Sequence, residues 1–270
     1  MGYQLAIIGA GQMAEAIVRG MLQSRLYQPS QLIAADVAEA RRKLFETELG
    51  IKAVNDNAEA AKQSGILLLS VKPYQMREVL GGIGAVVSPQ TLVISIAAGV
   101  RSGSIEDYLG QGKPWRVVRA MPNTPMLVGE GMVAIAPGKH ATSDDLAAAR
   151  KIFEASADVI EVVEDQIDAV TAMSGSGPAY FFYFVEQMIR AGVEMGLSPE
   201  QAHRLASKTA LGSAKMLLTS VDSPQELRRK VTTPHGTTHA AITHMEEKGM
   251  GEIIIQAVKA AQRRSKELGA

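Results

Sequence analysis

An apolar strand that leads directly into a glycine-rich turn and a helix is the most constraining feature of this sequence. The run reads Leu5-Ala6-Ile7-Ile8-Gly9-Ala10-Gly11-Gln12-Met13-Ala14. Gly9 permits a tight turn, Gly11 lets the backbone approach a pyrophosphate, and Ala14 is small enough for close helix–strand packing. The helix start then presents its amides to the phosphates. Because the pattern lies between a strand and a helix, it favours dinucleotide binding over an ordinary tight turn.

Short apolar runs alternate with helical patterns through the first 164 residues. The expected strands are 4–8, 32–35, 66–70, 92–96, 116–120, 132–136 and 159–163, and the expected helices are 13–22, 39–49, 58–62, 74–80 and 105–109. Several strands are apolar on both faces, as strands covered by helices on both sides are. This alternation predicts an α/β fold with a parallel, doubly wound sheet, a Rossmann domain.

The pattern becomes helical after the acidic stretch 161–165. Residues 177–195 form a long, nearly uncharged segment, Pro199 and Pro224 mark first helical turns, and 252–268 closes the chain. We therefore place a dinucleotide-binding domain at 1–164 and an all-helical domain at 165–270.

Five of the 12 aromatic residues are consecutive, at Tyr180-Phe181-Phe182-Tyr183-Phe184. Aromatic side chains thus surround this helix, which excludes a surface helix. Such a helix is central in its domain or buried in an oligomer, and a small helical domain has limited capacity to enclose it. The sequence favours a homodimer, and a monomer with a central helix is the alternative.

Charge and cysteine content narrow the chemistry and the partners. The chain has 28 Lys and Arg against 28 Asp and Glu, and it has no cysteine. This excludes disulfides, thiolate nucleophiles and Cys-bound metal centres. The first basic residue is Arg19, so no charged leader is expected, and no apolar run approaches the roughly 20 residues of a membrane span. Without a basic block, neither nucleic acid nor membrane is an expected partner, and a cytoplasmic location is expected.

The second expected strand ends at Asp36, 22 residues after Ala14. A carboxylate there accepts hydrogen bonds from ribose hydroxyls and repels a 2′-phosphate, which favours NADH. Arg41, Arg42 and Lys43 follow in the next helix and could instead pair with a 2′-phosphate, although a solvated helix face is the interpretation we favour for them. The cofactor is NADPH or NADH, with a slight preference for NADH.

Ligands bind beyond the carboxyl ends of strands in a doubly wound sheet, and small residues or prolines gather there. The segments are 70–73 (Ser-Val-Lys-Pro), 95–100 and 119–125. With 168–180 and 232–238, they closely resemble the pyrroline-5-carboxylate reductase family, from the first strand into the last helices. The Met-Ser-Gly-Ser-Gly-Pro-Ala-Tyr run at 173–180 and the Met-Pro-Asn-Thr-Pro run at 121–125 are highly specific to that family.

The resemblance implies the last step of proline biosynthesis, the NAD(P)H-dependent reduction of 1-pyrroline-5-carboxylate to L-proline by hydride transfer to the imine carbon. It also implies a helical dimerisation domain, an active site completed by the partner subunit, and rings of dimers. One departure is visible, because His235-Gly236 stands where the family usually has two glycines. His235 must therefore tolerate the backbone conformation of that loop or point outward.

The predicted site has two parts. The cofactor is expected to contact Gly9, Gly11, Gln12, Met13, Ala14, Asp36, Asn57, Ser70, Val71, Lys72, Pro73, Ala97 and Gly99. The substrate is expected to contact Met121, Pro122, Asn123, Ser174, Ser176, Thr233, Gly236, Thr237 and Thr238.

Thr238 is the candidate catalytic residue, as a hydrogen-bond partner of the imine or amine nitrogen. Simple helix capping is the alternative for Thr237 and Thr238, and a Gly-Ser turn is the alternative for Ser174 and Ser176. We expect Lys72 to contact the cofactor through its backbone. His235 and His239 lack a third ligand, so no metal is expected.

Two other functions are compatible with the glycine turn. A 3-hydroxyacid dehydrogenase would need a clear acid–base side chain at the domain junction, and none is prominent. A non-catalytic dinucleotide sensor would have no reason to retain the loop 232–238. A protonated cyclic imine needs no catalytic base, which suits motifs made of hydroxyls, glycines and amides.

Overall fold

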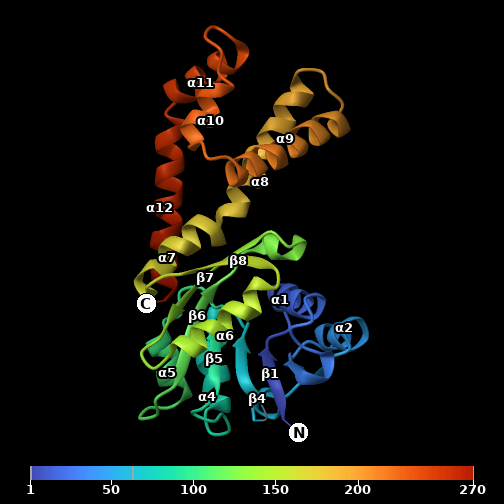
Figure 1. Ribbon diagram of the computed structural model, residues 1–270, viewed down its shortest axis with the longest axis vertical. Helices are drawn as coiled ribbons and strands as arrows, with labels where there is room; N and C mark the ends of the chain where they lie inside the picture. Colours follow the sequence, from blue (N-terminus) through green and yellow to red (C-terminus); the bar gives the residue numbers. More distant parts are fainter. Residues whose placement is uncertain (1, 63, 270) are drawn as a thin grey trace. The chain divides into compact units, whose positions relative to one another are not determined.

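Eight strands form one sheet in the computed structural model, which describes residues 2–62 and 64–269 (Figure 1). The strands are β1 Tyr3–Ile8, β2 Leu32–Ala35, β3 Lys52–Val54, β4 Ser64–Leu69, β5 Leu92–Ser95, β6 Arg116–Met121, β7 Gly131–Pro137 and β8 Ala157–Glu161. Their order is β3-β2-β1-β4-β5-β6-β7-β8, and β1 to β6 run parallel. The order reverses between β1 and β4, and ligands bind at such a switch point. The predicted Rossmann fold is confirmed.

The sheet is not parallel throughout, which corrects the prediction from the alternating pattern. Strand β7 pairs antiparallel with β6, and β8 pairs parallel with β7. The cause is the short connection 122–130, which holds only a 3-10 segment, Thr124–Val128. A parallel neighbour requires a crossover of a dozen or more residues, whereas an antiparallel neighbour does not.

Helices cover both faces of this sheet. One face holds α1 Gln12–Gln23, α2 Glu39–Leu49 and α6 Ser143–Glu154, and the other holds α3 Asn57–Ala61, α4 Met76–Ile83 and α5 Ser102–Leu109. Strand β1 supplies both cores, because Leu5 and Ile7 face the first set of helices while Ala6 and Ile8 face the second. Alternate side chains of a strand point to opposite faces, so a doubly covered strand is apolar throughout.

The chain divides into two compact units at Ser176. The first unit contains the sheet, α7 Ile167–Val170 and a π-helical turn Thr171–Gly175. The residues from Ala261 onward also belong to this first unit. The second runs from Gly177 to Ala260. Ile167 is buried with Met121 and Ala134 of the sheet, so the segment after residue 164 packs with the first unit.

The second unit is helical. It contains α8 Gly177–Glu194, α9 Pro199–Thr219, α10 Pro224–Lys230, α11 Thr237–Glu247 and most of α12 Met250–Leu268. Helices α8 and α9 approach closely, since a Cβ added at Gly192 would lie 3.0 Å from the Ala202 Cβ. None of the described helices is both long and apolar enough to cross a membrane.

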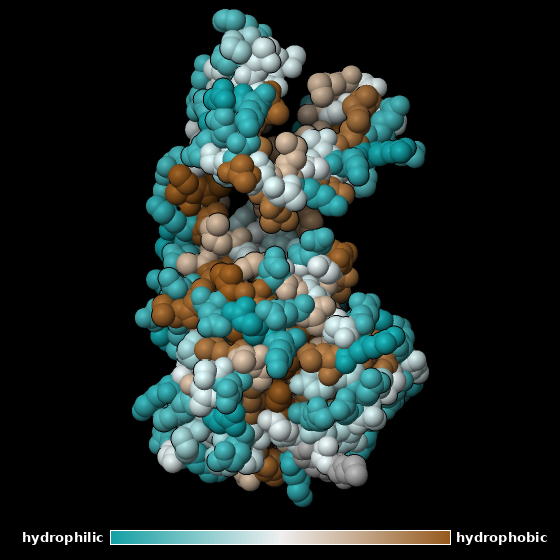
Figure 2. Space-filling model, viewed as in Figure 1, coloured by the Kyte–Doolittle hydropathy of each residue, from teal (hydrophilic) through white to brown (hydrophobic). Residues whose placement is uncertain are grey.

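The aromatic helix α8 does not lie at the centre of its unit. Phe181 and Phe182 are each 69% exposed, and Tyr183 is 65% exposed. Figure 2 accordingly shows hydrophobic residues at the surface of the helical unit. A helix with this much exposed aromatic surface needs a partner. The alternative of a monomer with a central helix is therefore wrong.

Candidate active site

The first part of the candidate site is the glycine turn, residues 9–11, which joins β1 to α1. Gly9 has a φ of +92°, and a Cβ there would lie 2.8 Å from the Ser70 carbonyl oxygen. Its amide donates a hydrogen bond of 2.8 Å to the Ala35 carbonyl. Only glycine combines this conformation with so close an approach of the loop after β4. The predicted tight turn is therefore present where β1, β2 and β4 end.

Gly11 has no side chain, which leaves the space at the N-terminus of helix α1 free. It has an ordinary φ of −70°, and a Cβ added to it would meet nothing within 4 Å. Gly11 is the N-cap of α1, and no side chain caps the helix. The first amides of a helix carry partial positive charge and need acceptors. Gln12, Met13 and Ala14 follow in the first turn, so these backbone groups fit the pyrophosphate of a dinucleotide.

Asp36 directly follows β2, as predicted, and its carboxylate lies beside the glycine turn. Its Oδ2 accepts a 2.7 Å hydrogen bond from the Ala10 amide, and its Oδ1 accepts one of 2.8 Å from the Ala38 amide. The carboxylate is thus fixed at the end of β2, where the ribose of a dinucleotide binds.

The three basic residues of α2 have different surroundings. Arg41 reaches back to the glycine turn, with Nε donating to the Ala10 carbonyl at 2.5 Å and Nη2 pairing with Glu15 at 2.8 Å. Arg42 donates to the carbonyls of residues 36 and 37. Lys43 pairs with Glu39 where both side chains are exposed. The interpretation as a solvated helix face therefore fits Lys43 but not Arg41.

Other predicted cofactor residues lie at the remaining strand ends. Asn57 opens α3 after the capping residue Asp56, and Ser70 and Val71 follow β4. Lys72 is exposed, its amide donates to the Gln75 side chain at 3.2 Å, and its carbonyl accepts from the Gln75 amide at 3.0 Å, so its contact with the cofactor through the backbone stays a prediction. Pro73 opens the 3-10 turn after it.

The loop after β5 faces the end of the chain. Ala97 is 5% exposed, and Gly99 has a φ of +78°. A Cβ on Gly99 would lie 3.0 Å from the Ser265 carbonyl oxygen. Ser265 is itself buried and donates a 2.6 Å hydrogen bond to Asp168. The end of α12 therefore covers this loop, a long-range contact that no local sequence pattern could reveal.

The segment after β6 meets the π-helical turn. Asn123 is 8% exposed, its Nδ2 donates to the Ser174 carbonyl at 3.1 Å, and its Oδ1 accepts from the Met132 amide at 2.9 Å. Met121 lies beside Gly175, while Pro122 separates Met121 from Asn123. Ser174 donates to the Val170 carbonyl, and the Ser176 amide donates to Thr171. The Gly-Ser segment is thus part of a π-helical turn, Thr171–Gly175, and such turns occur frequently at functional sites.

A buried ion pair precedes this segment, and no motif in the sequence indicated it. Arg119 is 3% exposed and pairs with Glu164 at 3.2 Å. Glu164 also accepts hydrogen bonds from the Ser102 amide and hydroxyl. Burial opposes ionisation of Glu164, but Ser102 and Arg119 outweigh it and hold its pKa below the usual range. A lone arginine in an apolar strand was the available signal, because a buried charge requires a partner.

The second part of the site is the loop 232–238, which lies in the helical unit. His235 has a φ of +62°, so it tolerates the left-handed conformation that glycine usually takes. Gly236 is the N-cap of α11, and no side chain caps this helix. The capping interpretation of Thr237 and Thr238 is therefore wrong. Among the described residues, neither hydroxyl has a hydrogen-bond partner, and Thr238 is half-buried.

Metal ligands do not gather around this loop. The rings of His235 and His239 lie 6.0 Å apart between centroids. No group of three or more His, Asp or Glu residues in the described ranges could hold a metal ion.

A glycine turn at a switch point, a carboxylate at the end of β2 and a separate helical unit with free hydroxyls define a dinucleotide-dependent oxidoreductase. The family model described as NADP oxidoreductase coenzyme F420-dependent matches residues 4–99. The model described as pyrroline-5-carboxylate reductase dimerisation matches residues 164–268. A pyrroline-5-carboxylate reductase of Synechocystis sp. is 43% identical, over 100% of this chain and 99% of the relative. The chain belongs to the pyrroline-5-carboxylate reductase family.

Two solved structures agree with this membership. The enzyme of Coxiella burnetii has a TM-score of 0.90 and 36% identity, over 100% of both chains. The enzyme of Plasmodium falciparum, solved with NADP bound, has a TM-score of 0.89 and 31% identity, over 99% of this chain and 98% of that chain. The predicted family, fold, oxidoreductase activity and nicotinamide cofactor are confirmed. Membership also decides against the dehydrogenase and sensor alternatives.

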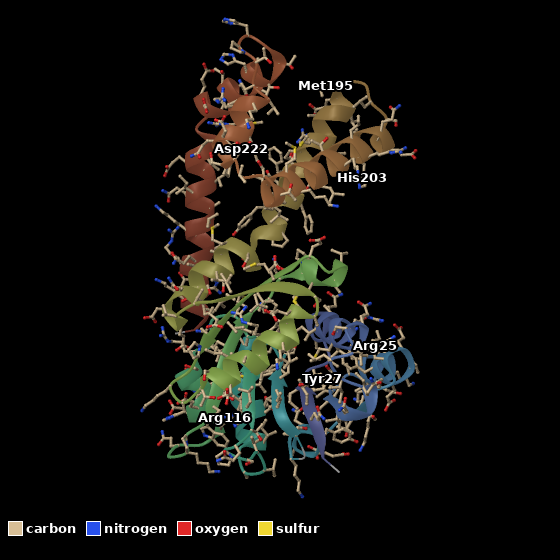
Figure 3. The ribbon with its side chains drawn as sticks, in the orientation of Figure 1. Arg25, Tyr27, Arg116, Met195, His203 and Asp222 are labelled. Atoms are coloured by element: carbon tan, nitrogen blue, oxygen red, sulfur yellow. The ribbon has the colours of Figure 1, made fainter. Side chains whose placement is uncertain are left out.

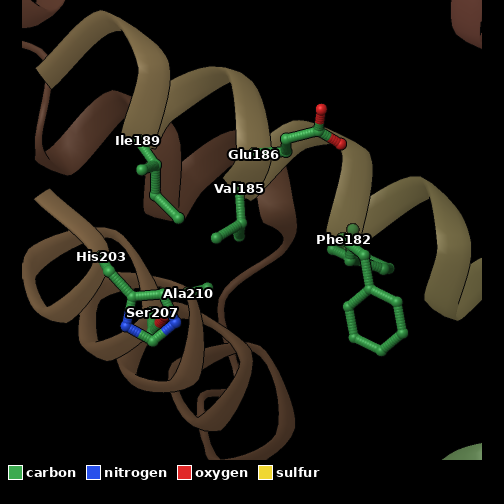
Figure 4. Close-up of a pocket in the computed structure, with 8 residues that line it drawn as sticks. Phe182, Val185, Glu186, Ile189, His203, Ser207 and Ala210 are labelled. Atoms are coloured by element: carbon green, nitrogen blue, oxygen red, sulfur yellow. The ribbon is translucent and has the colours of Figure 1, made fainter. Parts of the chain in front are cut away.

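The match to a dimerisation domain supports a homodimer. The apolar surface of the helical unit includes a groove of about 460 Å³ between α8 and α9. Figure 4 shows Val185 and Ile189 of α8 facing His203 and Ser207 of α9 across this groove.

Proposed function

We propose that the chain reduces 1-pyrroline-5-carboxylate to L-proline with NADPH or NADH through the residues predicted from its sequence. The observation that carries this function is the glycine turn, with Gly11 open and the helix behind it uncapped, in a chain of this family. The substrate is a cyclic imine that bears a carboxylate, so the site must bind an anion and orient a C=N bond.

The first unit holds the cofactor. Residues 9–14 receive the pyrophosphate on backbone amides, and Asp36 receives the ribose. Asn57, the segment 70–73, Ala97 and Gly99 complete the cofactor site. When bound, the cofactor supplies the hydride for the imine carbon. The chain's own contribution is orientation and exclusion of water.

The helical unit holds the substrate carboxylate at the loop 232–238. Thr233, Gly236, Thr237 and Thr238 offer hydroxyls and helix-start amides, the groups that bind an anion. The uncapped start of α11 supports this role, because its amides have no side-chain acceptor. Thr238 hydrogen-bonds the substrate nitrogen and fixes the plane of the C=N bond. If the imine enters protonated, its π electrons move to nitrogen as the carbon is reduced, and no base is needed.

Met121, Pro122, Asn123, Ser174 and Ser176 line the substrate side of the first unit. Asn123 acts through Ser174, since both ends of its amide bond to the backbone of this chain. Met121 packs against the π-helical turn, and Pro122 restricts the backbone between Met121 and Asn123.

The active form is a homodimer, and dimers assemble further into rings in the cytoplasm. The exposed aromatic side chains of α8 support burial against a second copy. A measurement of native mass tests the assembly: a ring requires a higher even multiple of the chain mass, and a plain dimer would refute the ring.

Turnover tests the proposed function. Purified protein should oxidise NADPH or NADH when 1-pyrroline-5-carboxylate is added and should form proline in equal amount. A matched control omits the substrate and must consume no reduced cofactor. Absence of turnover with both cofactors would refute the function.

A further inference from the structure

We propose that Glu15 makes the dinucleotide site prefer NADH to NADPH, by holding Arg41 away from a 2′-phosphate. This inference rests on the proposed function, because it concerns the cofactor of that reaction.

The position of Arg41 is the first step. The peptide groups of Ala10 are held from two sides, because the amide donates to Asp36 Oδ2 at 2.7 Å and the carbonyl accepts from Arg41 Nε at 2.5 Å. Asp36 stands where a carboxylate binds the ribose hydroxyls, and an arginine near that position accommodates a 2′-phosphate in NADP-binding folds. The Arg41 guanidinium is therefore close to the place that a 2′-phosphate would occupy.

The second step is that Arg41 is already engaged. Its Nη2 pairs with Glu15 Oε2 at 2.8 Å, and its Cζ lies 5.9 Å from the ring centroid of the buried Phe45. Its side chain is 25% exposed and that of Glu15 is 17% exposed, so water screens this ion pair only in part. Burial opposes ionisation of Glu15, but Arg41 and Arg19 outweigh it and hold its pKa below the usual range. Glu15 is therefore charged at neutral pH.

The third step is that Glu15 is the only carboxylate paired with Arg41 among the described residues. Arg19 also pairs with Glu15, but it has a second partner in Glu48 at 2.6 Å. Neutralising Glu15 would leave Arg19 paired and release the charge of Arg41 next to Asp36. A freed guanidinium binds phosphate through charge-assisted hydrogen bonds.

Arg42 is a competing candidate for a 2′-phosphate. Its Nη1 donates to the carbonyls of residues 36 and 37, at 2.8 and 2.9 Å, and it has no carboxylate partner in the described part of the chain. A change at Glu15 should not alter Arg42, so a double variant at Glu15 and Arg41 separates the two arginines.

The test is a fluorescence titration of the whole protein with NADH and with NADPH, without substrate. The unmodified protein should bind NADH more tightly. Glu15→Gln should tighten NADPH binding roughly tenfold, the value of one charge-assisted hydrogen bond, and should change NADH binding little. Glu48→Gln is the matched control, because it removes a carboxylate from Arg19 without touching Arg41, and it should change neither affinity. The double variant Glu15→Gln/Arg41→Gln should lose the gain.

Several results would overturn the proposal: tighter binding of NADPH by the unmodified protein, equal effects of Glu15→Gln and Glu48→Gln, or a gain that persists in the double variant. If Glu15→Gln does not fold, Arg41→Gln alone decides. It should weaken both dinucleotides equally through the turn, and a loss confined to NADPH would refute the proposal. Turnover with 1-pyrroline-5-carboxylate is measured separately, so a missing activity with the expected affinities would count against the proposed function alone.

Discussion

Gly9 and Gly11 should respond to the same substitution in opposite ways. Gly9→Ala should destabilise the sheet unit, whereas Gly11→Ala should leave its stability nearly unchanged and weaken dinucleotide binding. The reason is that a Cβ on Gly9 would stand 2.8 Å from the Ser70 carbonyl oxygen, whereas a Cβ on Gly11 would stand in open space.

The structure sets the size of both effects. A φ of +92° costs a residue with a Cβ about 1–2 kcal/mol. Relief of the clash must move the loop after β4, whose Ser70 amide bonds to the Ile8 carbonyl at 2.8 Å, and such overpacking costs about 1–3 kcal/mol. Gly9→Ala should therefore lose about 2–5 kcal/mol of unfolding free energy. Gly11→Ala should change it by less than about 1 kcal/mol but weaken NADH binding by at least about tenfold.

Trp115 provides the assay. It is the single tryptophan of the chain and is wholly buried in the sheet unit, so its fluorescence reports the unfolding of that unit in denaturant. Gly82→Ala is the matched control, because a Cβ there meets nothing within 4 Å and should stabilise α4 by about 0.5–1 kcal/mol. Unchanged stability of Gly9→Ala, or normal NADH binding by Gly11→Ala, would refute the reasoning.

Three further predictions concern single side chains. Asp145 is 1% exposed and pairs with Arg116, which Figure 3 labels. Burial opposes ionisation of Asp145, but Arg116 and Thr142 outweigh it and lower its pKa. The stabilisation is thus present at neutral pH and is lost as the pH falls through the lowered pKa. Because the Arg116 side chain is 32% exposed, Asp145→Asn should cost about 1.5–3 kcal/mol at pH 7, the value of a hydrogen bond to a charged group. In urea titrations this difference should shrink below about pH 4, and a constant difference would contradict the pairing. Thr238→Ala should lower kcat and leave dinucleotide affinity nearly intact, with Thr238→Ser as control; unchanged kinetics would remove its catalytic role. Asp36→Ser should raise kcat/KM for NADPH relative to NADH, and an unchanged ratio would show that Asp36 does not face the ribose.

Most of the sheet could be predicted because its strands are apolar runs bounded by turn residues. Strands β2 and β6 begin at the expected residues, and the glycine turn has the expected geometry. Strand β3 was missed because Lys52–Val54 is too short to show a pattern. The direction of β7 was missed because strand direction depends on how the connection 122–130 packs, which no periodicity records.

The site was predictable where a motif is local and unpredictable where contacts are distant. The turn at Gly9 and the carboxylate of Asp36 follow from spacing alone. Asn123 donates a hydrogen bond to Ser174, and Ser265 lies against Gly99. Each of these contacts joins residues that are far apart in the sequence. The pairing of Arg41 with Glu15 is also a contact between distant residues, and the sequence offered only a solvated helix face or a 2′-phosphate as surroundings for Arg41.

The most direct measurement follows the transferred hydrogen. The protein is given 1-pyrroline-5-carboxylate and NADH or NADPH that carries deuterium at the transferable position of the nicotinamide, and the proline is examined by mass spectrometry and NMR. Direct transfer to the imine carbon predicts one deuterium per L-proline. This deuterium should lie on the ring carbon that is bonded to nitrogen but does not carry the carboxylate. Proline without deuterium, deuterium on another carbon, or no proline at all would contradict the account.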